Sequence, residues 1–171
     1  MRKRLIIFVM FLLTSQWVVS LAHAGQGKLI GAAGLAQVEG SGGGGLVPWA
    51  TIAGYDSQDE ISITVAATSV NVDDYRLDNF AVAAGFFDRI EISAAHQKFD
   101  LSTAGGEIRQ SIYGVKARLA GDVIYSQWPQ VSIGAQHKRL LDGGIATALE
   151  ASKTDSDTDY YIAFTKIHLA A

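Results

Sequence analysis

Three features of this sequence have residue types that could support chemistry, and the first is the glycine run from Gly42 to Gly45. A glycine-rich loop can cradle phosphates, but a phosphate loop ends in Gly-Lys-Ser or Gly-Lys-Thr and leads into a helix. The residues that follow Gly45 supply neither of these. The run therefore predicts a flexible loop rather than a nucleotide site.

The second feature is a set of potential metal ligands. The histidines beyond the N-terminal region are His96, His137 and His168. They fall on separate predicted strands, too far apart for a local metal motif. Asp155, Asp157 and Asp159 alternate as in a calcium loop, but the glycine and glutamate that complete such a loop are missing. We expect a solvated loop here, with no metal and no cofactor.

The third feature is a group of charged residues on or beside predicted strands. Serine, histidine and acidic residues are present, but no Gly-x-Ser-x-Gly motif supports a nucleophile. We therefore expect no catalytic residue and no enzyme. Charges that lie inside a narrow β-barrel usually fill it and fix its shape. The candidate inward-facing charges are Arg89, Glu91, Lys116, Arg118 and Lys138.

The elements that would position these charges are β-strands. Between Ile61 and Val70, apolar residues alternate with serine and threonine, as on a strand with one apolar and one polar face. The same period of two recurs at 80–86, 90–95, 113–119 and 131–136, with weaker candidates at 28–38, 46–55 and 160–169. The short join Phe87-Asp88-Arg89 predicts a tight hairpin.

These segments amount to about eight strands of roughly 10 residues, close to the length that a tilted transmembrane strand requires. The predicted connections at 39–45, 71–77, 100–109 and 140–157 are long, whereas those at 56–59, 88 and 121–127 are shorter. Outer-membrane barrels show such an asymmetry, with longer loops outside the cell. The sequence predicts an all-β, antiparallel up-and-down β-barrel of a structural or passive-transport type, with the loops at 71–77, 100–109 and 140–157 facing outside if Gly25 starts in the periplasm.

The ends and the composition indicate an exported protein. Arg2, Lys3 and Arg4 precede an apolar run that stops at Ala22-His23-Ala24, which is typical of a cleaved signal peptide. We therefore divide the chain into a signal peptide, 1–24, and a β-barrel domain, 25–171. Cleavage would remove three of the 14 basic residues and none of the 17 acidic ones, and an acidic chain is not expected to bind nucleic acid. There is no cysteine, so no disulfide can form.

Alternation alone does not separate a membrane barrel from a soluble sheet, whose apolar face meets a second apolar layer. Aromatic residues near the predicted strand ends favour the membrane, since aromatic rings gather at the lipid headgroups. The candidate interface aromatics are Trp49, Tyr55, Phe86, Phe87, Tyr125, Trp128, Tyr160 and Tyr161. The expected partners are outer-membrane lipid and the barrel assembly machinery. The alternative is a soluble periplasmic barrel or sandwich that binds a hydrophobic ligand.

Several blocks of the sequence occur in an order that matches one family. They are Gly40 to Ala50, Ile52 to Tyr55, Asp74 to Asp78, Gly85 to Glu91, Gly114 to Leu119, Trp128 to Val131, Asp159 to Tyr161, and Thr165-Lys166. Together they resemble a proteobacterial family known as domain of unknown function number three-zero-three-four. The resemblance implies an outer-membrane β-barrel of undetermined role. The chain does not finish on the aromatic residue that is common in bacterial barrels, so it is expected to be either an atypical barrel or the front part of a longer one. Members of the family that it resembles run beyond Ala171, which favours a barrel truncated at its C-terminus.

Overall fold

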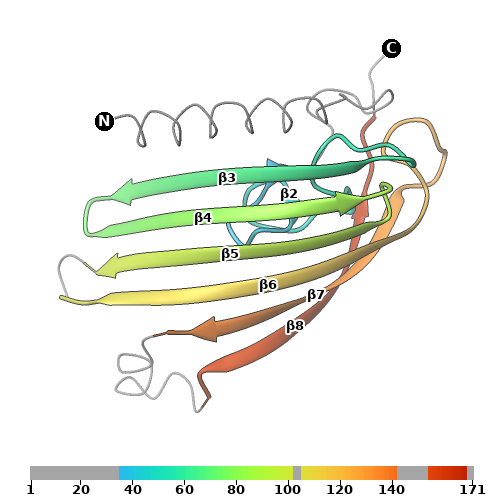
Figure 1. The fold of residues 1–171 in the computed structure, drawn as a ribbon. Coiled ribbons are helices and arrows are strands. Elements are labelled where there is room, and N and C mark those ends of the chain that lie inside the picture. The colour runs from blue at the N-terminus through green and yellow to red at the C-terminus, as the bar shows by residue number, and fades with distance from the viewer. Residues whose placement is uncertain (1–34, 102–104, 142–153, 169–171) are drawn as a thin grey trace, which may run out of the picture.

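The computed structural model describes residues 35–101, 105–141 and 154–168, and within these residues the chain is all β (Figure 1). The predicted signal peptide, residues 1–24, lies outside the described residues. Two strands have two residues each, and six have ten to fourteen. The strands are β1 (Leu35–Ala36), β2 (Gly42–Gly43), β3 (Ile61–Val72), β4 (Tyr75–Phe86), β5 (Ile90–Leu101), β6 (Glu107–Ala120), β7 (Gln130–Leu140) and β8 (Ser156–Thr165).

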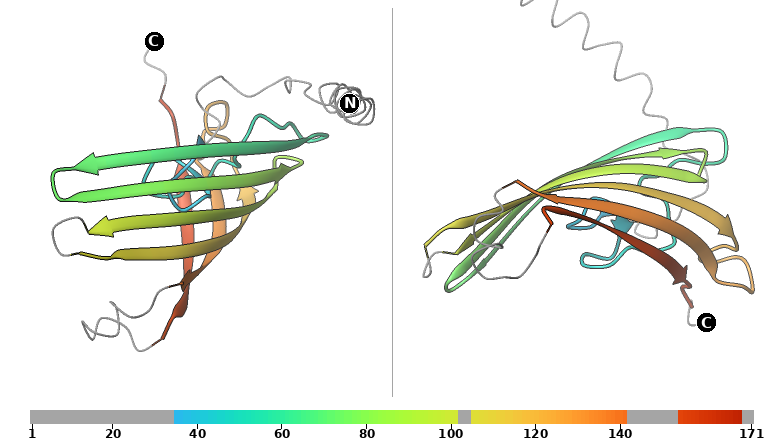
Figure 2. Two further views of the ribbon diagram at one scale, coloured as in Figure 1. Left: turned by 60° about the vertical axis from the view of Figure 1, so that its left-hand side comes forward. Right: turned by 90° about the horizontal axis from the view of Figure 1, so that it is seen from below.

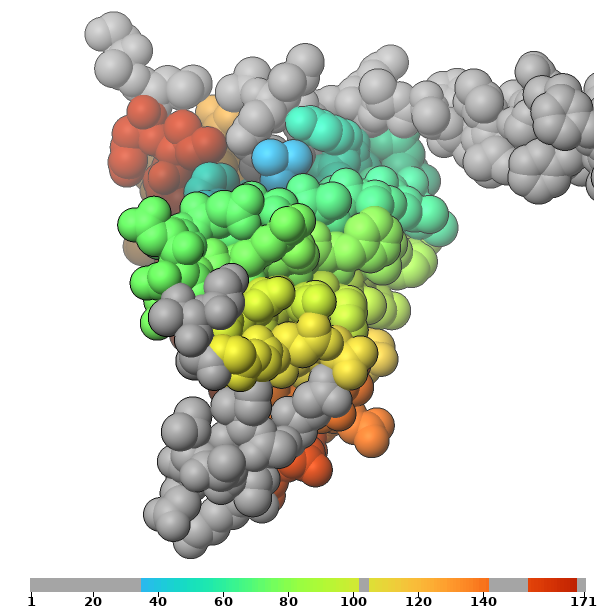
Figure 3. Space-filling model, turned by 90° about the vertical axis from the view of Figure 1, so that its left-hand side faces the viewer, coloured from blue at the N-terminus to red at the C-terminus, as the bar shows by residue number. Residues whose placement is uncertain are grey.

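The six long strands form one antiparallel sheet in which each strand pairs with the next along the chain. Figure 3, viewed from the loop-rich end, shows them in order from β3 in green, through β5 and β6 in yellow, to β8 in red. The sheet is strongly twisted and curled (Figure 2), but β3 and β8 do not pair with each other. The expectation of an all-β antiparallel fold, with the sheet left open, is confirmed.

The connections alternate between two ends of the sheet (Figure 1). We call the end at which residues 87–89 and 121–129 connect the strands the turn end, and the opposite end, at which residues 73–74 connect β3 and β4, the loop end. The predicted hairpin at Phe87-Asp88-Arg89 is confirmed, and the amide of Arg89 donates to the carbonyl of Phe86 across it. The long loop expected at 71–77 is wrong: β3 and β4 pair up to Val72 and Tyr75 and leave a two-residue turn, because the alternation continues past Val70.

Residues 35–60, which we call the inner segment, lie on one face of the sheet (Figure 2). The expected strand at 46–55 is wrong, because its backbone hydrogen-bonds mainly to side chains of the sheet rather than to a neighbouring strand. The core of this layer includes Ala50, Ile52 and Ala53, which are fully buried. We call the sheet face that it covers the inner face, and the opposite one the outer face.

The two faces differ in composition along the half of the sheet nearest the turn end. On the inner face Glu91, Ser132 and Gln136 are buried, whereas on the outer face Ile63 and Ile162 are exposed. Toward the loop end the pattern reverses. Tyr75 and Phe99 stack on the inner face, with ring centroids 5.7 Å apart, and the outer face there carries a charged group that we call the outer belt. The outer belt consists of Arg76, Asp78, Lys98, Glu107 and Arg109.

Candidate functional site

The most deeply buried charges of the described residues form one ion pair on the inner face. Lys116 on β6 and Glu91 on β5 occupy paired positions of the register, and their Nζ and Oε2 atoms lie 3.0 Å apart. Their side chains are 0% and 1% exposed. Burying two charges is costly unless each finds further hydrogen bonds, so their remaining partners decide what the pair does.

The inner segment supplies those partners. The Glu91 carboxylate accepts hydrogen bonds from the Ser41 hydroxyl at 2.7 Å and from the amides of Gly42 and Ala53 at 3.0 and 2.7 Å. The Lys116 ammonium donates to the carbonyls of Gly42 and Trp49 at 2.9 and 3.2 Å. A single ion pair therefore fixes two separate stretches of the inner segment against the sheet.

Neutral side chains extend this attachment across β7 and β8. The backbone carbonyl of Ala50 accepts hydrogen bonds from the side-chain amide of Gln130 at 2.8 Å and from the Ser132 hydroxyl at 2.5 Å. The amide of Ala50 donates to the Thr165 hydroxyl at 2.9 Å. The inner face thus holds the inner segment mainly through the segment's backbone, which explains why its side-chain pattern gave no indication of this docking.

Arg118, another of the candidate inward charges, lies at the turn end. Its guanidinium pairs with the Asp88 carboxylate of the β4–β5 hairpin and donates to the Gly121 carbonyl at 2.7 Å. Asp122 lies 3.7 Å from the same guanidinium. Burial raises the pKa of Asp122, but the amides of Tyr125 and Ile124 and the charge of Arg118 outweigh it, so this pKa lies below its usual range.

The other two candidate charges lie apart from the Glu91–Lys116 pair. Lys138 on β7 reaches across the inner face to Glu39 at 2.5 Å and to Asp159 at 3.0 Å. Arg89 is exposed in the β4–β5 hairpin, where its carbonyl accepts from the amide of Arg118. The structure therefore brings Glu91 and Lys116 together, places Arg118 and Lys138 in separate clusters, and leaves Arg89 outside all three.

Sequence reasoning missed the acidic partners of these clusters. Asp56 is buried at the turn end, where it accepts hydrogen bonds from the Ser62 hydroxyl at 2.7 Å and from the Asp88 amide at 2.8 Å. Glu39 and Asp88 complete the ion pairs of Lys138 and Arg118. All three lie in connections rather than strands, so period-two alternation could not assign them to a face.

The candidate interface aromatics divide into two groups. Tyr55, Phe87, Tyr125 and Trp128 are exposed around the turn end, and Tyr160 is exposed on the outer face of β8. Phe86 is half-buried, and Trp49 is half-buried within the inner segment. Tyr161 occupies an inner-face position, and its hydroxyl lies 3.2 Å from that of Ser41. Five of these eight aromatics are therefore exposed on the surface of the described residues.

The histidines do not converge. His96 and His137 lie on the outer face, with the Nδ1 atom of His137 2.9 Å from the Thr158 hydroxyl, and His168 follows β8. Within the part of the chain that the structure describes, no three histidine or acidic side chains are grouped so that they could hold a metal ion. A helix long and apolar enough to cross a membrane is also not found among those residues.

Comparison with known proteins identifies the family. Residues 32–171 match the model of a family described as "Protein of unknown function (DUF3034)". Because the match spans most of the chain, this protein belongs to that family, and the resemblance predicted from its sequence blocks is confirmed. No curated protein and no solved structure matches the chain.

Proposed function

We propose that this chain forms a wall of an outer-membrane β-barrel, with its outer face toward lipid and its own inner segment filling the inner side. The observation that carries this proposal is the inverted arrangement of the sheet. In a water-soluble antiparallel sheet the apolar face packs into a core and the polar face meets water. Here Ile63, Ile162 and Phe164 are 74%, 58% and 63% exposed, whereas polar Ser132 and Gln136 are 0% and 2% exposed.

The exposed apolar residues form a continuous band rather than scattered patches. Paired positions of a sheet share one face, and the outer row that starts at Ile61 continues through Ile90 to Ile133 and Ile162. On β3 the band extends from Ile61 to Ala67, about 20 Å at roughly 3.3 Å per residue. The outer belt borders it on one side, and the exposed aromatics of the turn end border it on the other.

The alternative, a soluble binding module, would enclose its apolar side chains around a pocket. The band instead lies on the face opposite the inner segment, and the inner face beneath that segment is polar and filled. This distribution favours lipid over an enclosed hydrophobic ligand.

The role that follows is structural rather than catalytic. Lys116, Glu91 and Ile52 are among the largest fully buried side chains of the described residues, and all three belong to the contact between sheet and inner segment. A filled inner face stabilises the wall. Backbone groups at a lipid-exposed edge would lack hydrogen bonds, so the free edges of β3 and β8 are proposed to pair with further strands in the membrane assembly.

The test is to fold the full chain with and without detergent micelles and to compare circular dichroism with gel migration before and after boiling. The proposal predicts β-sheet formation only in detergent, with heat-dependent migration. Folding in plain buffer, with near-ultraviolet dichroism from fixed aromatic residues, would favour the soluble binding module and overturn the membrane proposal.

A further inference from the structure

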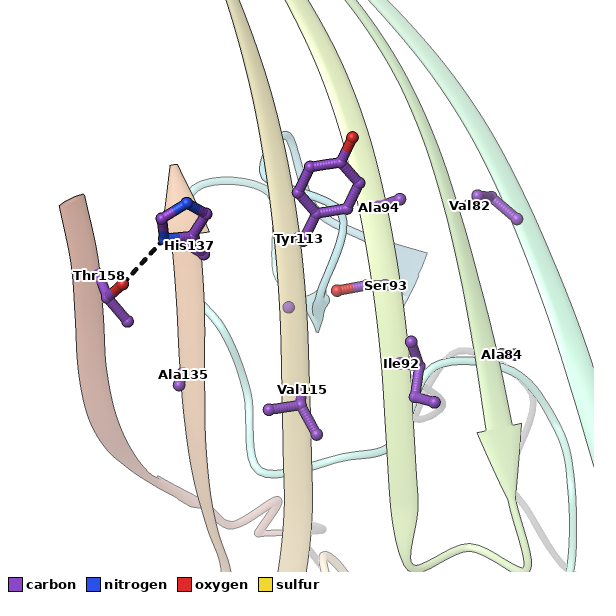
Figure 4. Close-up of a pocket in the computed structure, with 11 residues that line it drawn as sticks. Val82, Ala84, Ile92, Ser93, Ala94, Tyr113, Val115, Ala135, His137 and Thr158 are labelled. Atoms are coloured by element: carbon purple, nitrogen blue, oxygen red, sulfur yellow. Dashed lines mark hydrogen bonds between the residues drawn. The ribbon is translucent and has the colours of Figure 1, made fainter. Parts of the chain in front are cut away.

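The outer face is hollowed by two adjoining depressions, of about 500 and 570 Å³. Figure 4 shows the first, which lies on the face opposite the inner segment. Ala84, Ala94 and Ala135 line it, and Ile92, Tyr113 and Val115 lie beside them (Figure 4). The hollow exists because these alanines occupy outer-face positions whose paired neighbours on the adjacent strands carry larger side chains.

The second depression continues across β6, β7 and β8. Val115 and Ala135 line both depressions, so the two form one branched hollow. Its other apolar walls include Ile133, Tyr160 and Ile162. Each branch lies within the volume range of about 300–1,000 Å³ that is typical of sites for small organic molecules.

The end of the hollow nearest the outer belt carries polar side chains. His137 and Thr158 line it there and contact each other, with Tyr113 beside them (Figure 4). Arg139 is exposed two residues further along β7, on the same face. Among residues 35–101, 105–141 and 154–168, Arg139 takes part in no ion pair.

We propose that this branched hollow binds one anionic phospholipid, with an acyl chain in each branch and the phosphate at Arg139 and His137. The proposal rests on the proposed membrane location. It goes further because it names a specific lipid site on the outer face. Contact with a bilayer alone would require only a uniform apolar band. An apolar hollow with two branches, and a guanidinium on the same face two residues beyond its polar end, match the two chains and one negative charge of such a lipid.

The experiment uses the full chain, exported by a Gram-negative host and purified from its membranes. It is placed in phosphatidylcholine bilayers that contain trace spin-labelled phosphatidylglycerol or spin-labelled phosphatidylcholine. The fraction of each label that is immobilised on the protein gives the relative affinity. We expect phosphatidylglycerol to be preferred by about five-fold, the effect of one basic residue at a membrane surface, with the preference falling at high salt.

Two variants and one control locate the site. Arg139→Gln should lower the preference to near unity while heat-dependent migration is unchanged. Ala135→Phe, at a position shared by both branches, should reduce the immobilised fraction of both lipids. Ala67→Phe, on the outer face of β3 outside the hollow, should leave both values unchanged.

The outcomes separate this inference from the proposed function. A chain absent from the host membranes would overturn both. A chain that enters the bilayer with no preference for phosphatidylglycerol, or with a preference that Arg139→Gln leaves intact, would overturn the lipid site alone. Should Ala135→Phe fail to fold, the Arg139→Gln result still decides, because that side chain is exposed and stabilises no described contact.

Discussion

Ion pairs on the two faces of this sheet each join one basic and one acidic side chain but differ in their surroundings. On the inner face, Glu91 and Lys116 are almost fully buried and also bind the backbone of the inner segment. On the outer face, Arg76 and Asp78 pair at 2.8 Å with side chains 54% and 41% exposed. Exposed pairs contribute little to stability, whereas removing one partner of a buried pair leaves an uncompensated charge. The inner pair should therefore determine stability, and the outer belt should mainly keep that edge of the sheet polar.

The largest expected effect comes from breaking the inner pair. Lys116→Met leaves the buried Glu91 carboxylate without its counter-charge, and we expect a loss of about 3–5 kcal/mol of unfolding free energy. Urea unfolding in micelles, followed by tryptophan fluorescence, measures this loss. Arg76→Met is the matched control on the outer face and should cost no more than about 1 kcal/mol. Equal losses in the two variants would show that burial of the pair is not what matters.

The next effect concerns the outer face. Val115→Arg places a charge in the middle of the apolar band, which should cost about 2–4 kcal/mol in a lipid bilayer. Asn71→Arg adds the same charge on the outer face at the loop end, opposite Arg76 in the register, and should cost no more than about 1 kcal/mol. Urea titration of both variants in vesicles makes the comparison. If Val115→Arg were as stable as Asn71→Arg, the outer face would be in contact with water.

A smaller effect should follow from crowding the junction between the inner segment and β3. Gly54 has a φ of 97°, and a Cβ atom there would lie 2.2 Å from the Ser62 hydroxyl oxygen. Gly54→Ala should cost about 1–3 kcal/mol from overpacking in addition to the backbone term. Gly45 has a φ of 111° with nothing within 4 Å of such an atom, so Gly45→Ala reports the backbone term alone. Thermal unfolding of the two variants should show Gly54→Ala to be the less stable.

The smallest effect is a pH dependence at the turn end. The pKa of Asp122 is lower in the folded protein than in the unfolded chain, where it is about 3.9. The ionised carboxylate therefore stabilises the fold at pH values above the unfolded pKa. This contribution is lost as the pH falls through the lower pKa of the folded protein. Asp122→Asn should therefore reduce stability slightly at pH 7 and leave it nearly unchanged at pH 2. Urea midpoints at the two pH values test this, and a larger loss at pH 2 than at pH 7 would contradict the assignment.

The strands could be predicted from the sequence because period-two alternation reflects local geometry. Ile61, Ile63 and Val65 define the outer face of β3 without reference to any other strand. The inner segment could not be predicted in this way, since Gly42, Ala50 and Ala53 bind through their backbone groups to Glu91, Lys116 and Ser132 on distant strands. Alternation identified Glu91 and Lys116 as residues of one face, but not which of the five candidate charges would meet.

The aromatic residues near the predicted strand ends favour the inverted arrangement of the sheet, but alternation by itself does not decide it. Alternation shows that two faces differ, and only the packing of residues 35–60 against the polar face shows which of them is covered. Tyr161 illustrates the difficulty, because it follows Tyr160 directly and yet lies on the opposite face, with its hydroxyl beside Ser41. A tyrosine at a strand position fits either face by composition alone.

The central claim is that the outer face meets lipid, and a nitroxide scan along β3 tests it most directly. The chain contains no cysteine, so single cysteines at positions 61 to 68 can each carry one spin label in the bilayer-reconstituted protein. Collision rates with oxygen, which concentrates in lipid, and with a water-soluble nickel complex are then compared. We predict that positions 61, 63, 65 and 67 favour oxygen and that positions 62, 64 and 66 do not. Strong collision with the nickel complex at positions 61, 63 and 65 would contradict the account.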